Sequence, residues 1–420
     1  MRPDSANASL QTLRRFSIIA SSSVCIGSAV ALFLWLLQTA IDTRFHYPWL
    51  LYLLPLAGLA IHFIYRTIGK SSEKGNNLII DEIHEPGAGV PPQMAPVILI
   101  TTVITHLFGG SAGREGTAVQ IGGGIAERFA TLFKLKAEER KTLLTAGVAA
   151  GFGAVFGTPI AGAVFAIEVL TVGKLRYKDF IPCLIAAFFG HFVVLLWGIK
   201  HTAYRIDLPE SQSFAGFILH DLRLIPKVIL ASAAFGLMSS VFSISVHGTK
   251  KFFLQLLPQT WLIPLIGGCL IIALTFILGK PDYLSLGVDP QYPGSVTIQS
   301  AFQSGGANNF SWLWKTVYTV LTLGTDFKGG EVTPLFYIGA TLGNTVAGIL
   351  SAPVSLFAAL GFVAVFAGAT KTPIACAVMA CELFGPEHAF LFSASCFVAF
   401  LCSGRKGIYR SQRRNSETRF

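Results

Sequence analysis

An internal repeat limits the possible folds to those built from two related halves. TPIAGAVFAIE at 158–168 matches TPIACAVMACE at 372–382 at eight of eleven positions, with an offset of 214 residues. Upstream, GREGT at 113–117 matches GGEVT at 329–333 with an offset of 216. Two matches in the same order at nearly the same offset are poorly explained by chance. Each half therefore holds a Gly-x-Glu-x-Thr motif, a helix, and then a TPIA helix that ends in glutamate.

Apolar segments recur along nearly the whole chain. Hydrophobic residues make up 52% of the sequence and charged residues 13%, whereas a soluble protein carries about a quarter charged residues. Several segments approach the roughly 20 residues that cross a bilayer, and others are interrupted by Gly or Pro. The sequence therefore predicts an all-α polytopic membrane protein. The runs lie at 16–40, 49–65, 95–108, 143–155, 180–197, 228–245, 261–278, 354–367 and 389–402.

Charged residues at the ends of these segments give the expected domain limits. We predict a cytoplasmic leader at 1–15, transmembrane repeats at 16–200 and 225–404, an inter-repeat loop at 201–224 and a short basic cytoplasmic tail at 405–420. The positive-inside rule places both termini of this multi-pass protein in the cytoplasm. The membrane that it spans is expected to be the inner (plasma) membrane. The net charge of +10 is therefore interpreted as a topology signal, and nucleic acid is not an expected partner.

The sequence predicts neither an enzyme nor a cofactor or metal site. The seven cysteines lie in or beside apolar runs without a CxxC pair. His84-Glu85 lacks the second histidine of a zinc helix, and no phosphate-binding GxxxxGK[ST] occurs. GGSAG at 109–113 fits the GxSxG of a hydrolase, but a membrane segment precedes it where that fold needs a strand.

The candidate functional residue is Glu115, inside the glycine-rich stretch 109–124. An ionisable residue at membrane depth is a functional hypothesis by default. A helix-like run starts after Glu115, and a helix N-terminus attracts anions. The ionised carboxylate would block such a site, and the protonated side chain would leave it, so one residue would exchange a proton for an anion. The alternative is a capping glutamate or one that pairs with Arg114.

Five further polar residues are candidates for the anion path or for structural roles. Glu331 matches Glu115 in the repeat. Glu168 and Glu382 end the TPIA helices, and we expect them to pair with Lys174 and other basic residues at a cytoplasmic mouth rather than to carry protons. Asn76, after Gly75, is either part of a turn or an anion donor. Tyr409 is likewise either an interface anchor or a hydroxyl donor.

Repeated halves of transporters meet near the membrane midplane, where interrupted helices point their positive ends at an anionic substrate. The residues alone leave open whether the two halves are inverted.

Several motifs resemble those of one family. GREGT closely resembles the GREGP motif of the CLC chloride channels and chloride/proton antiporters, GEVTP at 330–334 resembles their GxFxP, and GNNLI at 75–79 stands where they have GSGIP. The resemblance spans about 15–410 and implies the CLC fold, with two inverted-topology repeats whose broken helices meet at a midplane anion site. It also implies a homodimer in the lipid bilayer with one pore per subunit, here without CBS domains because the tail is short.

The resemblance assigns roles to particular residues. Glu115 becomes the external gate, backbone amides near Asn76, Glu115 and Val332 line the anion path, and Tyr409 lies at its inner end. The expected anion-binding set is Asn76, Gly113, Arg114, Glu115, Gly116, Thr117, Glu331, Val332, Thr333 and Tyr409.

The departures from the CLC motifs indicate the ion. The family serine becomes Asn76, the GREGP proline becomes Thr117, the aromatic of GxFxP becomes Val332, and the internal proton-transfer glutamate falls at Val169. GREGT and GEVTP together resemble the bacterial fluoride-type branch, which exchanges fluoride for protons. Fluoride is strongly hydrated and needs strong donors, such as an Asn amide and a Thr hydroxyl. The prediction is a fluoride/proton antiporter; the alternative is a chloride-selective CLC transporter or voltage-gated-type chloride channel.

Overall fold

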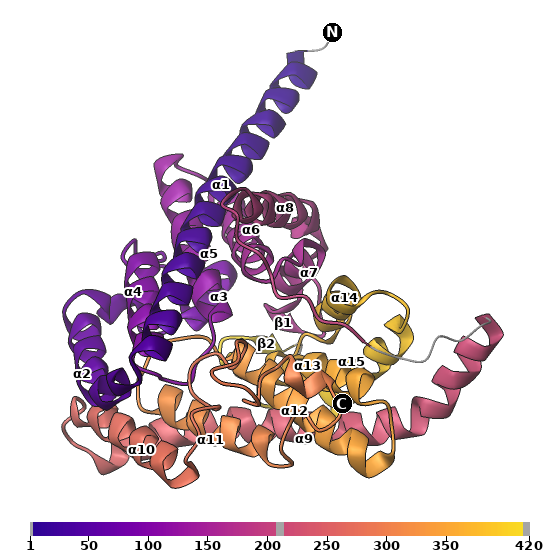
Figure 1. Cartoon of the computed structure of the whole chain (residues 1–420). Coiled ribbons are helices and arrows are strands. Elements are labelled where there is room, and N and C mark those ends of the chain that lie inside the picture. The colour runs from indigo at the N-terminus through magenta and orange to yellow at the C-terminus, as the bar shows by residue number, and fades with distance from the viewer. Residues whose placement is uncertain (1–2, 207–213, 415–420) are drawn as a thin grey trace.

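Figure 1 shows a computed structural model of the chain, in which residues 3–206 and 214–414 are described. The first repeat lies above the second in this view, and a two-stranded parallel sheet, β1 (Thr171–Val172) with β2 (Arg413–Arg414), lies between them. The helices of the first repeat are α1 (Pro3–His46), α2 (Leu54–Ile64), α3 (Asn76–His84), α4 (Met94–Leu107), α5 (Glu115–Leu132), α6 (Ala137–Phe156), α7 (Pro159–Glu168) and α8 (Phe180–Leu196). Those of the second are α9 (Phe214–Leu256), α10 (Leu262–Leu278), α11 (Ser311–Gly324), α12 (Val332–Leu350), α13 (Val354–Thr370), α14 (Pro373–Phe384) and α15 (Ala389–Cys402).

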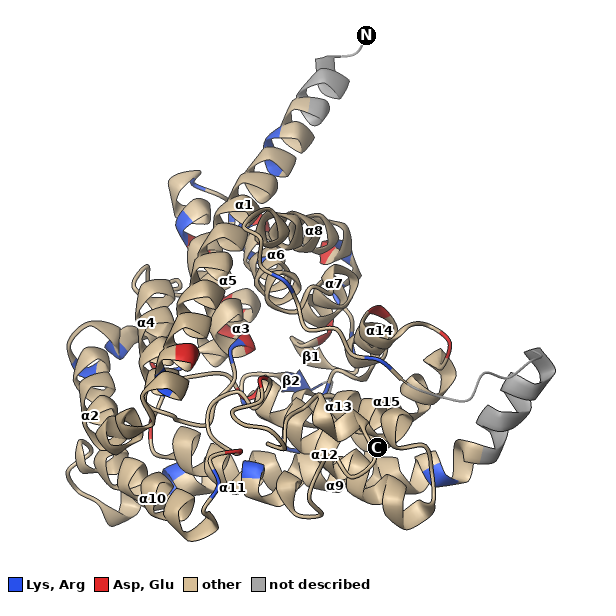
Figure 2. Cartoon of the chain, in the orientation of Figure 1, with Lys and Arg blue, Asp and Glu red and all other residues tan. Residues whose placement is uncertain are grey.

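The helices have the length and composition of a membrane protein. Charged residues are sparse along them (Figure 2). Within the described residues, five helical segments are long and apolar enough to cross a bilayer, and several apolar helices of 10–17 residues accompany them. The predicted polytopic helical architecture is therefore confirmed. The five segments are Leu10–His46, Pro48–His84, Tyr177–Leu196, Leu224–Leu256 and Val332–Leu350.

Glycines allow the same close helix packing in both repeats. A Cβ built on Gly122 of α5 would lie 2.1 Å from the carbonyl oxygen of Gly147 on α6. A Cβ built on Gly339 of α12 would lie 2.1 Å from the carbonyl oxygen of Gly361 on α13. In lipid, such contacts between backbones replace the hydrophobic effect as the source of helix association.

The TPIA helices α7 and α14 show how the repeats are related. The Glu168 carboxylate, at the end of α7, accepts hydrogen bonds from the N–H groups of Ile374 (3.1 Å) and Ala375 (2.7 Å) in the first turn of α14. Conversely, Glu382 at the end of α14 accepts from Ile160 (3.0 Å) and Ala161 (2.7 Å) in α7. Because the C-terminal end of each helix contacts the N-terminal end of the other, α7 and α14 are antiparallel. Equivalent helices therefore run in opposite directions, which is the inverted topology.

The predicted pairing of these two glutamates with Lys174 and its basic neighbours is wrong. Each carboxylate instead satisfies two backbone donors at the N-terminus of the other repeat's helix, where the helix dipole also favours a negative charge. Neither forms an ion pair with any residue of the described ranges.

The match between Glu115 and Glu331 is wrong by one residue. Gly113 and Gly330 form an antiparallel bridge, with N–H to carbonyl distances of 2.6 and 2.7 Å. From these glycines, α5 begins at Glu115, whereas α12 begins at Val332. Val332 is therefore the structural equivalent of Glu115, and Glu331 precedes its helix.

Two predicted boundaries also differ from the structure. The leader at 1–15 is helical from Pro3 and continuous with α1, since Pro is tolerated in the first turn of a helix and no glycine follows it there. The loop at 201–224 already gives way to α9 at Phe214. Parts of the predicted leader, loop and tail, residues 1–2, 207–213 and 415–420, lie outside the described residues, so these domain limits stay predictions there.

Candidate functional site

The Glu115 carboxylate is held between the two repeats. It is 2% exposed, and both its oxygens lie 2.6 Å from the Thr333 hydroxyl. Oε2 also accepts hydrogen bonds from the N–H groups of Thr333 (3.0 Å) and Arg114 (3.2 Å). The Arg114 guanidinium is 3.7 Å from Oε1. These donors come from the starts of α5 and α12, so the carboxylate lies where two helix N-termini meet.

Glycines leave room for this carboxylate. A Cβ on Gly113 would lie 3.0 Å from Glu115 Oε2 and 3.0 Å from the Gly330 carbonyl oxygen. A Cβ on Gly116 would lie 3.1 Å from Asn76 Nδ2 and 3.6 Å from Glu331 Oε2. Gly116 thus faces a space that is lined by the Asn76 amide and the Glu331 carboxylate. This space is adjacent to the position of the Glu115 carboxylate.

Cavities lie on both sides of Glu115. A vestibule of about 620 Å³ is lined by Asn76, Glu331 and Tyr409, and by several lysines that include Lys250 and Lys251. On the other side, a cavity of about 30 Å³ is lined by Glu115, Arg114 and Thr333. Glu115 therefore separates a wide basic vestibule from a much smaller cavity.

The small cavity is covered by the segment after α8. His201 and Tyr204 line it. The Tyr204 ring packs on Phe302 and Phe362, with centroids 5.5 and 5.4 Å apart. Burial and the nearby Arg114 lower the pKa of His201 to about 4, so its ring is neutral at pH 7. This cover was not foreseen because it depends on contacts between the inter-repeat loop and both repeats.

Not every expected residue faces this site. The Thr117 hydroxyl is hydrogen-bonded to that of Thr102 on α4 at 2.8 Å, so the threonine hydroxyl beside the gate is that of Thr333. The Asn77 side chain, the neighbour of Asn76, accepts from the N–H of Ser411 and anchors the C-terminal segment.

Val332 is the first residue of α12, and its side chain is buried.

Gln120 is a residue that the sequence analysis missed. It lies on α5 more than one turn after Glu115, lines the vestibule, and its Nε2 would be 3.3 Å from a Cβ on Gly75. Its buried Oε1 has no hydrogen-bond partner among the described residues. A polar side chain within a glycine-rich membrane helix was a signal that could have identified it.

The model of the family described as "Voltage gated chloride channel" matches residues 57–404. The chain belongs to this family, the CLC proteins. CLC proteins are channels and transporters, and the resemblance seen in the motifs is confirmed.

Individual CLC proteins give more detail. A chloride/fluoride channel protein of Pseudomonas syringae pv. tomato is 47% identical over 389 residues, or 92% of this chain and 83% of its own. The H(+)/Cl(−) exchange transporter ClcA of Vibrio cholerae serotype O1 is 25% identical over 337 residues, or 73% of this chain and 68% of its own. A crystal structure of a CLC-type fluoride/proton antiporter superposes with a TM-score of 0.87 and 31% identity, covering 97% of this chain and 99% of that one. The CLC fold is therefore confirmed over nearly the whole chain.

Proposed function

We propose that this CLC protein exports fluoride across the inner membrane of a bacterium in exchange for protons, with Glu115 as the gate. The observation that carries the proposal is the carboxylate of Glu115 held by the hydroxyl and N–H of Thr333, between the vestibule and the small outer cavity. A carboxylate bound by such donors stands in for the transported anion.

The exchange follows from the charge of Glu115. When ionised, its carboxylate competes with the anion for the donors of Thr333 and the helix N-termini. When protonated, it is a weaker acceptor and leaves these donors to the anion. Because the carboxylate and the anion occupy the same donors in turn, and the carboxylate leaves them when it binds a proton, the movements of proton and anion through the protein are coupled.

Asn76 is the proposed source of fluoride selectivity. Its amide Nδ2 would lie 3.1 Å from a Cβ on Gly116, next to the Glu115 position. This N–H group is the part of the amide that can donate to an incoming anion, since the amide oxygen only accepts. Fluoride loses a tightly bound water shell on entry, and an amide donor replaces part of it.

The orientation and the oligomeric state complete the proposal. Both termini lie in the cytoplasm, because basic residues flank the first and last membrane segments. The wide vestibule then opens to the cytoplasm and the His201 cover lies outside. A homodimer would bury apolar side chains that one subunit exposes to lipid, among them Ile160, Ile181, Phe192 and Ile374 on α7, α8 and α14.

Ion flux from proteoliposomes tests this function. Vesicles loaded with fluoride or chloride are diluted into anion-free buffer, and anion efflux and external pH are recorded together. We expect fluoride efflux with uphill proton movement, and a shift toward chloride in Asn76→Ser. Chloride efflux at an equal or greater rate in the unmodified protein would instead support the alternative, a chloride transporter or channel.

A further inference from the structure

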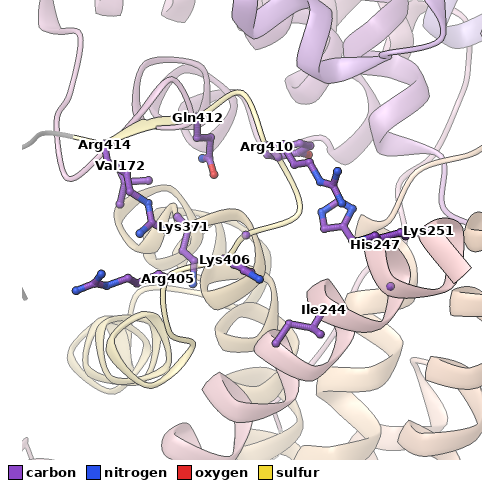
Figure 3. Close-up of a pocket in the computed structure, with 13 residues that line it drawn as sticks. Val172, Ile244, His247, Lys251, Lys371, Arg405, Lys406, Arg410, Gln412 and Arg414 are labelled. Carbon is purple, nitrogen blue, oxygen red and sulfur yellow. The ribbon is translucent and has the colours of Figure 1, made fainter.

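A cavity of about 450 Å³ lies beside the C-terminal segment, next to the vestibule. Figure 3 shows His247 and Lys251 of α9 at one side of it and Lys371, Arg405 and Arg414 at the other. Among the described residues, no aspartate or glutamate lines this cavity, whereas six basic side chains do: Lys251, Lys371, Arg405, Lys406, Arg410 and Arg414. We call it the basic cavity.

The charge of the basic cavity is not balanced by acidic side chains of the described residues. The adjacent Lys250 and Arg413 pair with Asp326 and Glu85, respectively. None of the six lining cations forms an ion pair with another residue in 3–206 or 214–414. Like charges gathered around one space repel one another, and an anion with several charges relieves that repulsion.

The walls of the basic cavity are fixed before any ligand binds. Gln412 Nε2 donates to the carbonyl oxygens of Val169 (2.9 Å) and Thr370 (2.7 Å), which ties the C-terminal segment to both repeats. The buried Lys371 ammonium donates to the Ser403 carbonyl and hydroxyl oxygens at 3.1 and 2.6 Å. These acceptors are neutral, so they hold the ammonium in place without cancelling its charge.

An apolar strip on α9 leads away from the basic cavity. Ile244 lines the cavity and is 53% exposed. Val241 and Leu237 are 52% and 61% exposed, and they follow at helical spacing on the same face. In a bilayer such a strip contacts acyl chains, and a soluble phosphate compound would make no use of it.

We propose that the basic cavity binds the phosphate-bearing headgroup of an anionic phospholipid, with an acyl chain along the strip from Leu237 to Ile244. Arginine and lysine bind phosphate through charge-assisted hydrogen bonds, and basic pockets between transmembrane helices fit such headgroups. In the proposed orientation this cavity faces the cytoplasmic leaflet, where anionic lipids are available.

The bound lipid would also affect transport, a consequence that rests on the proposed function. The basic cavity and the vestibule share His247, Lys251, Tyr409 and Arg410. A headgroup that neutralises Lys251 and Arg410 removes positive potential from the entrance that attracts the anion. The apparent KM for fluoride is therefore higher in membranes with anionic lipid than in neutral ones.

Lipid retention tests the binding without any transport measurement. The full-length protein is reconstituted in phosphatidylethanolamine with a minor share of phosphatidylglycerol, extracted, and its bound lipids are counted by native mass spectrometry. The test variant is Arg405→Gln/Lys406→Gln/Arg414→Gln. These three side chains are exposed, and none of them lines the vestibule. A matched control, Arg128→Gln/Lys134→Gln/Lys136→Gln, removes equal charge from exposed residues at the end of α5 and the following turn.

We expect the unmodified protein and the control to retain phosphatidylglycerol and the test variant to lose it. Each cation near a membrane surface contributes about fivefold to the affinity, so three contribute about 100-fold. Equal retention by test and control variants would overturn the proposal. Calorimetry with inorganic pyrophosphate in neutral detergent distinguishes a soluble source: pyrophosphate binding that the test variant loses, without selective lipid retention, would overturn the membrane source. Selective retention of phosphatidylglycerol by an unmodified protein that shows no fluoride transport would count against the proposed function alone.

Discussion

Thr333→Val should release the gate while keeping its shape, because valine is nearly isosteric with threonine but has no hydroxyl. The Thr333 hydroxyl lies 2.6 Å from both oxygens of Glu115. A hydrogen bond to a charged group contributes about 1.5–3 kcal/mol. The N–H of Thr333, at 3.0 Å, remains. The carboxylate should therefore leave this position about ten- to hundredfold more readily.

The expected phenotype is faster anion movement with looser proton coupling. Fluoride efflux and proton uptake are measured in the same proteoliposomes, and the ratio of protons to fluoride should fall in Thr333→Val. Thr341→Val is the matched control, since Thr341 lies further along the same helix and its hydroxyl donates only to backbone carbonyls, of Tyr337 at 2.7 Å and Ile338 at 3.3 Å. An unchanged proton-to-fluoride ratio in Thr333→Val, or an equal fall in Thr341→Val, would refute the reasoning.

Three further predictions concern stability. Glu382→Ala leaves the N–H groups of Ile160 and Ala161 without their acceptor, so the free energy of unfolding in detergent should fall by about 1–3 kcal/mol. The control Glu387→Ala changes an exposed side chain and should lower it little or not at all. Gly122→Ala forces a Cβ to within 2.1 Å of the Gly147 carbonyl oxygen and should lower the yield of folded protein, whereas Gly348→Ala, which meets nothing within 4 Å, should not. Because the folded-state pKa of His201 is lowered to about 4 from 6.5, its stabilising contribution is complete above pH 6.5 and is lost as the pH falls toward 4. That loss is at most about 3 kcal/mol, so His201→Gln should show a smaller drop in melting temperature between these pH values, and an identical drop would exclude His201 as its origin.

The membrane architecture, the duplication and the gate candidate were predictable because their signals are local. Apolar runs give the membrane segments, and GREGT gives Glu115 at the start of a helix. The sequence similarity of the two halves could be recognised because the TPIA segments match closely. The antiparallel arrangement of the halves could not be derived from residue patterns alone, because it depends on which end of one helix contacts which end of the other.

The contacts that define the site could not be predicted from local pattern. Thr333 and Glu115 are separated by 218 positions, and Glu168 and Ala375 by 207. A carboxylate at the end of an apolar helix has the same sequence signature whether it reaches water or the N-terminus of a distant helix. The error at Glu331 has another cause: the motif alignment favoured identical letters, while the Gly113–Gly330 bridge sets the structural register.

Proton-coupled transport by Glu115→Gln decides whether Glu115 is the gate. Glutamine keeps the size of the side chain but cannot release a proton or compete as an anion. The account predicts that, in fluoride-loaded proteoliposomes, Glu115→Gln shows no fluoride-driven uphill proton movement, while the control Glu387→Gln behaves like the unmodified protein. Proton movement that persists in Glu115→Gln, with fluoride efflux unchanged, would contradict the assignment of Glu115 as the gate.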